Sequence, residues 1–127
     1  MVKDDLSVVP EDLYHLGNSS EPRLTCLRSR DLILREINGI VMVVANGGGI
    51  AFVSKERLEK SPMTGWVWRL NKHTAIPSGL ILINDRPGHY CIAPKKNMPL
   101  SEYLKRLAQL APKGQKLFRK EVVSWPL

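Results

Sequence analysis

The side chain best suited to chemistry is the imidazole of His89, which directly follows a predicted turn ending at Gly88. Histidine changes its charge near neutral pH, so it can move a proton or hydrogen-bond a ligand in a cleft. Cys91 lies two residues further on, on the same face of a predicted strand. The two Cβ atoms are then about 7 Å apart, too far for a direct thiolate–imidazole pair. For either residue alone, a structural role is the simpler interpretation.

Three further sets of residues could contact a ligand. Arg28 ends a mostly apolar predicted strand, where its guanidinium either enters a cleft or is solvated. The run from Asn46 to Gly49 lacks the spacing of a dinucleotide fingerprint and the Lys-Ser/Thr of a P-loop, so a hairpin turn is the default. Three consecutive glycines exceed what a turn needs, and they would let a flat ligand approach the backbone. Trp66 and Trp68 share one predicted strand face, which is more often core than a stacking platform.

The sequence predicts neither a metal site nor a disulfide. Its three histidines and two cysteines do not have the spacing of zinc ligands. Cys26 and Cys91 both fall in predicted strands, and a reduced pair in the cytoplasm is preferred to a disulfide.

The segment from Ile76 to Pro94 must position His89, and it is predicted to form two strands joined by a tight turn. Residues 80–83 are a short apolar run rich in branched side chains, which is typical of a buried strand. Residues 84–88 have turn chemistry, because Asn and Asp tolerate special backbone angles, Pro fixes φ and Gly allows positive φ. Residues 89–93 form the second strand.

The remaining elements are expected to support this hairpin. Residues 40–44 carry no polar side chain, so both faces of this strand should be covered, with a glycine hairpin leading to a strand over 50–53. Residues 1–21 indicate a flexible acidic arm with a helical turn at 11–16, and residues 22–127 a single domain. Helices are expected over 30–37 and 55–60 and from Pro99 onwards, and strands over 24–28, 65–70 and 120–125.

The composition is that of an ordinary globular domain, but the charge is uneven. The chain has 127 residues and a net charge of +7, and residues 95–127 hold eight bases and two acids. This favours an acidic partner, such as nucleic acid, a phosphate-bearing ligand or an acidic protein, although a solvated basic surface explains it equally well. No apolar run approaches the roughly 20 residues that span a bilayer. The N-terminus lacks an apolar signal region, so a cytoplasmic protein is expected, with no membrane partner.

Several segments together resemble a known family. They are Leu24–Arg28, Gly39–Phe52, Ile76–Leu80 and His89–Pro94, followed by Met98. Their order and spacing are similar to those of the small ADP-ribosyltransferase-like toxins exported by bacterial type VI secretion systems. The resemblance covers roughly residues 22–110, and the His-Tyr-x-Ile-x-Pro end before an amphipathic helix is its most specific part.

The resemblance implies an α+β fold, a split antiparallel β-sandwich with a few short helices and an NAD cleft between two small sheets. Arg28 would grip the dinucleotide, His89 would be the closing-strand histidine, and Gly48 and Gly49 would form the second-strand motif. Where the family has residues with hydroxyl side chains after its paired glycines, this chain has Gly49 and Ile50.

For the nicotinamide, the resemblance implies stacking on Trp66 or Tyr90. The catalytic glutamate of most ADP-ribosyltransferases is not located. Glu102 and Glu121 are the acids nearest the end of the fold, and neither lies in a motif.

Three functions remain open at this point. The first is an NAD-dependent mono-ADP-ribosyltransferase-like toxin that acts inside a target cell on an unidentified acceptor and is neutralised by an acidic cognate immunity protein. The second is a non-enzymatic basic module that binds nucleic acid or an acidic protein, with salt-sensitive affinity. The third is a toxin of the same fold that no longer uses NAD.

Overall fold

The computed structural model describes residues 4–20, 22, 24 and 32–121. It is an α+β fold in which every named strand pair is antiparallel, as expected from the resemblance. The strands are β1 (Asp4–Leu6), β2 (Leu13–Gly17), β3 (Leu34–Ile37), β4 (Ile40–Val43), β5 (Ile50–Val53), β6 (Gly65–Leu70), β7 (Leu80–Arg86), β8 (His89–Pro94), β9 (Met98–Pro99) and β10 (Gln115–Lys120). The helices are α1 (Lys55–Lys60), α2 (Leu100–Ala108) and the 3-10 turn η1 (Ala111–Lys113).

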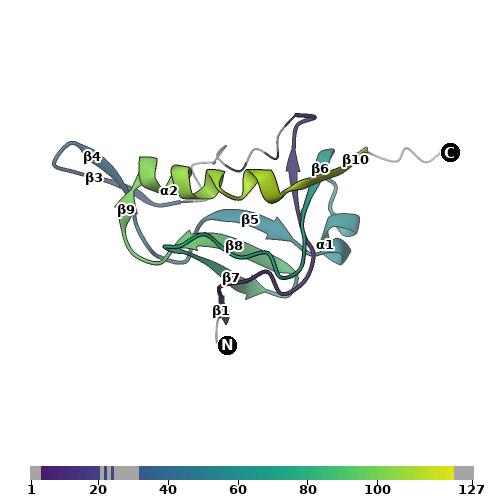
Figure 1. Cartoon of the computed structure of the whole chain (residues 1–127), viewed down its shortest axis with the longest axis horizontal. Coiled ribbons are helices and arrows are strands. Elements are labelled where there is room, and N and C mark those ends of the chain that lie inside the picture. Colours follow the sequence, from purple (N-terminus) through teal and green to yellow (C-terminus); the bar gives the residue numbers. More distant parts are fainter. Residues whose placement is uncertain (1–3, 21, 23, 25–31, 122–127) are drawn as a thin grey trace.

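The strands form two sheets, which confirms the split β-sandwich. Seven strands form the main sheet in the order β1-β7-β8-β5-β2-β6-β10, and β3-β4-β9 form a small second sheet (Figure 1). Helix α2 packs on the main sheet through its buried side chains Tyr103 and Leu107, which join a core that includes Phe52 and Ile92. Within the described residues, no helix has both the length and the apolar character needed to cross a membrane.

The β7–β8 hairpin forms as the sequence predicts, with a longer first strand. β7 continues to Arg86, so the turn is reduced to Pro87-Gly88, where Gly88 has a φ of 72°. The backbone N–H of Ser54 donates to the Gly88 carbonyl at 2.9 Å and thus ties the turn to the start of α1. A Cβ on residue 88 would lie 2.7 Å from the Ser54 hydroxyl, so both φ and space favour glycine there.

The helix expected over residues 30–37 is wrong for the described part of that range. Residues 34–37 are strand β3, which pairs with β4 across Asn38 and Gly39, at φ of 52° and 79°. Two consecutive positive φ values match the two-residue turns that suit the twist of a hairpin. The Asn-Gly pair was therefore the decisive local signal.

The expectation that both faces of the 40–44 strand are covered is also wrong. Ile40 is 52 % exposed and Val41 is 43 % exposed, whereas Val43 is fully buried. The tip of the β3–β4 hairpin extends away from the main sheet (Figure 1), so only its base contacts β9 and the core.

The glycine run joins the two sheets, and the predicted 39–53 hairpin is wrong. β4 belongs to the small sheet and β5 to the main sheet, so the chain crosses between them here. A Cβ on Gly49 would lie 1.9 Å from the carbonyl oxygen of Ile92 and 2.9 Å from the hydroxyl oxygen of Tyr103. The Tyr103 hydroxyl donates to that same Ile92 carbonyl at 2.6 Å and accepts from the Ile50 N–H at 3.3 Å. Glycine is thus required for close packing of the chain itself.

The N-terminal residues expected to be a flexible arm supply two strands of the main sheet. β1 pairs with β7, and β2 pairs with β5 and β6. The helical turn expected at 11–16 is wrong, because residues 13–17 form strand β2. Both faces of this strand are covered. Leu13 joins the main core, while its neighbour Tyr14 packs with Leu58 of α1 and Val67. Adjacent strand residues point to opposite faces, so α1 and α2 cover different faces of the sheet.

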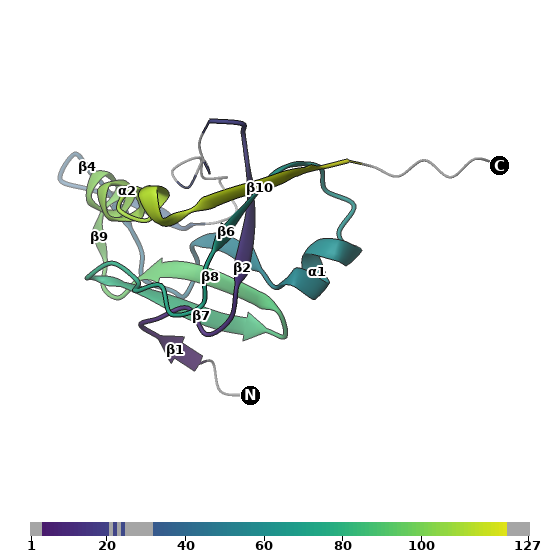
Figure 2. The same ribbon diagram turned by 45° about the vertical axis from the view of Figure 1, so that its right-hand side comes forward.

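The other predicted elements are confirmed or displaced. α1 and β6 have the expected bounds, and α2 begins directly after Pro99. The last described strand, β10, lies earlier than predicted, at 115–120, and runs alongside β6 (Figure 2). The predicted strand 24–28 lies mostly outside the described residues, and so do Cys26, Arg28 and the chain beyond residue 121.

Candidate active site

A cavity of about 1070 Å³ opens where helix α1 and strands β2 and β5 meet the turn of the β7–β8 hairpin. Its volume matches the upper end of the range for small-molecule sites. The side chains of aspartate, glutamate, histidine, lysine and arginine type that line it are those of Glu11, His15, Glu56, Arg57, Lys60, Arg86 and His89. The cavity therefore combines imidazoles, carboxylates and guanidinium groups, which suits a polar ligand that carries negative charge.

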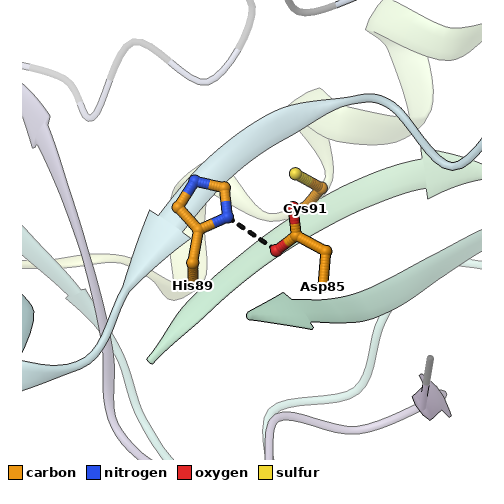
Figure 3. A group of neighbouring side chains, drawn as sticks. All are labelled: Asp85, His89 and Cys91. Atoms are coloured by element: carbon orange, nitrogen blue, oxygen red, sulfur yellow. Dashed lines mark hydrogen bonds and ion pairs between the residues drawn. The ribbon is translucent and has the colours of Figure 1, made fainter. Parts of the chain in front are cut away.

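His89 is held at this cavity by the carboxylate of Asp85, a residue that the sequence indicated only as part of a turn. The Nδ1 atom of His89 lies 2.7 Å from the Oδ1 atom of Asp85 (Figure 3). The two side chains are 15 % and 29 % exposed, so the pair is largely shielded from solvent. An ionised carboxylate only accepts hydrogen bonds, so Nδ1 carries the proton and Nε2 of the neutral ring is the proton acceptor.

A β-bulge explains how Asp85 reaches His89. In the β7–β8 ladder, Asn84 pairs with Tyr90 and Arg86 pairs with His89, which leaves Asp85 as the extra residue. The Asn84 amide donates to the Arg86 carbonyl at 2.7 Å and to the His89 carbonyl at 3.0 Å, and thereby fixes the bulge. Bulges redirect side chains and are frequent beside active sites. The bulge thus makes a preorganised Asp85–His89 pair.

A second histidine, His15 of β2, also lines the cavity. Its Nδ1 donates to the Ala51 carbonyl at 3.0 Å, and its ring centroid lies 5.1 Å from that of Phe52. The sequence did not point to His15, because residues 11–16 were expected to form a helical turn of the arm. The signal that could have found it was the position of the imidazole beside the apolar Leu13 and Tyr14.

Two glutamates line the cavity, and they differ in environment. The Tyr90 hydroxyl donates to Glu11 Oε2 at 2.7 Å, which fixes that carboxylate on the wall. The side chain of Glu56 on α1 is 78 % exposed, and the hydrogen bond from Lys60 at 2.9 Å lowers the pKa of its carboxyl. Glu11 is therefore the better positioned acid. Glu102 instead pairs with Arg106 on α2 at 2.8 Å, and Glu121 lies 3.8 Å from Arg119.

The two arginines of the cavity lie beside the hairpin turn. Arg57 donates from Nη1 to the Pro87 carbonyl at 3.2 Å, and its aliphatic chain packs over Gly88. Arg86 Nε lies 4.0 Å from the Asp85 carboxylate. Guanidinium groups form paired hydrogen bonds with phosphates, so both residues suit an anionic ligand.

Of the predicted site residues that the structure describes, His89 alone lines this cavity. Tyr90 is 6 % exposed in the main core, with its hydroxyl on Glu11. Trp66 is half-buried on β6, where Lys116 Nζ lies 4.9 Å from its ring centroid. Gly48 and Gly49 lie in the connection between the sheets, and Arg28 lies outside the described residues.

One comparison with known proteins identifies the family. The family model of the Tse2 ADP-ribosyltransferase toxin matches residues 11–116, which extend from the end of the first connection to strand β10. No curated protein and no solved structure matches the chain. The match includes β2 with His15, the β7–β8 hairpin with Asp85 and His89, and all of α1 and α2. The chain therefore belongs to the Tse2 ADP-ribosyltransferase toxin family, a family of type VI effectors.

Proposed function

We propose that the cavity beside α1 binds NAD and that the chain transfers the ADP-ribosyl group of NAD to an acceptor in a target cell. The observation that carries this proposal is the Asp85–His89 pair on the wall of the cavity, in a chain of an ADP-ribosyltransferase toxin family. NAD is the substrate of that reaction class. The acceptor is a macromolecule with a nucleophilic oxygen, nitrogen or sulfur atom.

The transfer breaks one bond and forms one bond. The C–N bond between ribose and nicotinamide breaks, and its electron pair leaves with the nicotinamide. The acceptor atom attacks the ribose carbon and loses its proton to a base, for which Nε2 of His89 is oriented by Asp85. Positive charge develops on the ribose during the cleavage, and a fixed carboxylate stabilises it. Glu11, held by Tyr90, fills the role of the glutamate that the sequence did not locate.

The diphosphate of NAD requires fixed positive charge. Arg57 and Arg86 supply it within the described residues, on the same side of the cavity as the hairpin turn. Arg28, the predicted phosphate-gripping residue, is proposed to contribute from its segment outside the described range. With the phosphates held, the C–N bond is oriented toward His89.

The basic-module alternative receives less support, because several of its basic groups are used inside the chain. Lys116 Nζ donates to the Ser19 carbonyl at 2.8 Å, and Lys120 Nζ donates to the Ser61 and Met63 carbonyls at 2.5 and 2.9 Å. We propose that the remaining positive charge instead attracts an acidic immunity protein, which would neutralise the toxin in the producing cell. The toxin then acts after delivery into the cytoplasm of a target cell.

NAD should stabilise the folded protein. A ligand that binds only the folded state raises the free energy of unfolding by about 2.7 kcal/mol at one hundred times its Kd. We expect the melting temperature of the wild-type protein to rise with NAD concentration, and we expect Arg57→Gln, which removes a phosphate contact, to reduce the rise. Lys72→Gln, on an exposed loop outside the cavity lining, is the matched control and should keep the full rise. No rise at saturating NAD would refute the proposed substrate.

A further inference from the structure

The β7–β8 hairpin gathers three side chains that can each coordinate a metal ion. The donor atoms of Asp85, His89 and Cys91 all lie within 4.8 Å of one another. Figure 3 shows the imidazole and the carboxylate facing each other, with the thiol beside them. The spacing of histidines and cysteines predicted no metal site, and the bulge that adds Asp85 to the set is not visible in that spacing.

We propose that Asp85, His89 and Cys91 form a binding site for a divalent cation of the zinc class. Thiolate, imidazole and carboxylate are the three donor types that zinc uses in proteins. With bonds of about 2.0 Å to nitrogen or oxygen and 2.3 Å to sulfur, donors in a tetrahedral site lie about 3.2 to 3.7 Å apart. The imidazole–carboxylate contact of 2.7 Å must open by about 0.5 Å, and the thiol must close in by about 1 Å at most. Small side-chain rotations supply such movements.

The surroundings of the three donors favour binding. Cys91 is 9 % exposed, and the Asn84 amide fixes the backbone between the other two donors. A thiolate and a carboxylate together neutralise a divalent ion, with the thiol proton released to solvent. Arg86 Nε lies 4.0 Å from the carboxylate, and its positive charge weakens this attraction. His89 also lines the cavity, so a water molecule can take the fourth position from that side.

Metal binding would switch off the chemistry proposed for His89, and this consequence rests on the proposed function. When Nδ1 of a neutral imidazole binds a metal ion, the ring proton lies on Nε2. Nε2 can then no longer accept a proton from the acceptor. The bound ion also removes Asp85 from its role as the hydrogen-bond partner of the ring. Zinc would thus hold the toxin inactive until the ion is removed.

Cobalt spectroscopy tests the site without any measurement of activity. The full chain, freed of metal and kept reduced with a non-chelating phosphine, is titrated with Co²⁺. We expect a thiolate-to-cobalt band in the near ultraviolet and visible bands of tetrahedral cobalt, all of which disappear when Zn²⁺ is added. Cys91→Ser should abolish the near-ultraviolet band. Asp85→Asn, at a partly buried position, should weaken binding by roughly tenfold or more.

The second cysteine provides the matched control. Cys26→Ser should keep the full cobalt spectrum, and circular dichroism melts should show that each variant is folded. An absent cobalt band in the wild type, or a band that survives in Cys91→Ser, would overturn the proposal. With NAD as substrate, zinc should inhibit the wild type and spare Cys91→Ser. A chain that binds cobalt as described but does not use NAD would refute the proposed function and leave the metal site standing.

Discussion

His89→Gln is expected to lower the rate of ADP-ribosyl transfer by about 10²- to 10⁴-fold, the usual contribution of a positioned proton acceptor. Glutamine keeps a polar side chain of similar length but cannot accept the proton from the attacking atom. The side chain is 15 % exposed, so the fold should tolerate the change. The readouts are growth of cells that express the chain and labelling of their proteins with ADP-ribose.

Matched variants show whether the effect belongs to the active site. His73 lies on an exposed loop and does not line the cavity, so His73→Gln should remain fully toxic. Asp85→Asn, which keeps an amide oxygen as the acceptor but loses the negative charge beside the ring, should be impaired less than His89→Gln. Glu11→Gln should lower turnover while NAD still binds, because the lost charge acts on the transition state. Full toxicity of His89→Gln would place the chemistry elsewhere.

Gly49→Ala is expected to destabilise the fold by about 3 kcal/mol or more, near the upper end of overpacking effects. Its Cβ would overlap the Ile92 carbonyl at 1.9 Å, and a backbone atom in a paired strand cannot move aside as a side chain can. The same Cβ would displace the Tyr103 hydroxyl from its bond to Ile92. Urea denaturation measures the loss.

Gly39→Ala separates the effect of space from that of backbone conformation. Gly39 has a φ of 79° and no atom within 4 Å of an added Cβ, so this change costs only the strain of positive φ, about 1 kcal/mol. A smaller loss for Gly49→Ala than for Gly39→Ala would mean that the connection between the sheets relaxes, contrary to the packing described here.

The sequence predicted those parts of the fold whose signals are local. Turn residues at 84–88 and the apolar strands beside them specified the β7–β8 hairpin, and Ser54 specified the start of α1, where its hydroxyl accepts from the Arg57 N–H. The glycine run misled because Asn-Gly predicts a turn, whereas the partner of Gly49 is a backbone 43 residues further along the chain, at Ile92. Such a contact leaves no trace in a local pattern.

The candidate site was predictable only at His89. Asp85 reaches the imidazole through a shift in strand register, and register depends on the whole ladder. His15 and Glu11 line the cavity because β2 inserts between β5 and β6. Residues 1–21 were expected to be a flexible arm, so this insertion was not predicted. The buried position of Tyr90 likewise depends on α2 covering the sheet.

The three histidines of the chain allow the most direct test of the proposed NAD site. His15 and His89 line the cavity, and His73 does not. In an NMR titration with NAD, we expect the ring signals of His15 and His89 to shift together and saturate with one dissociation constant, while those of His73 stay unchanged. Unchanged signals from His15 and His89 at saturating NAD, or a shift of His73 alone, would contradict the assignment of this cavity as the active site.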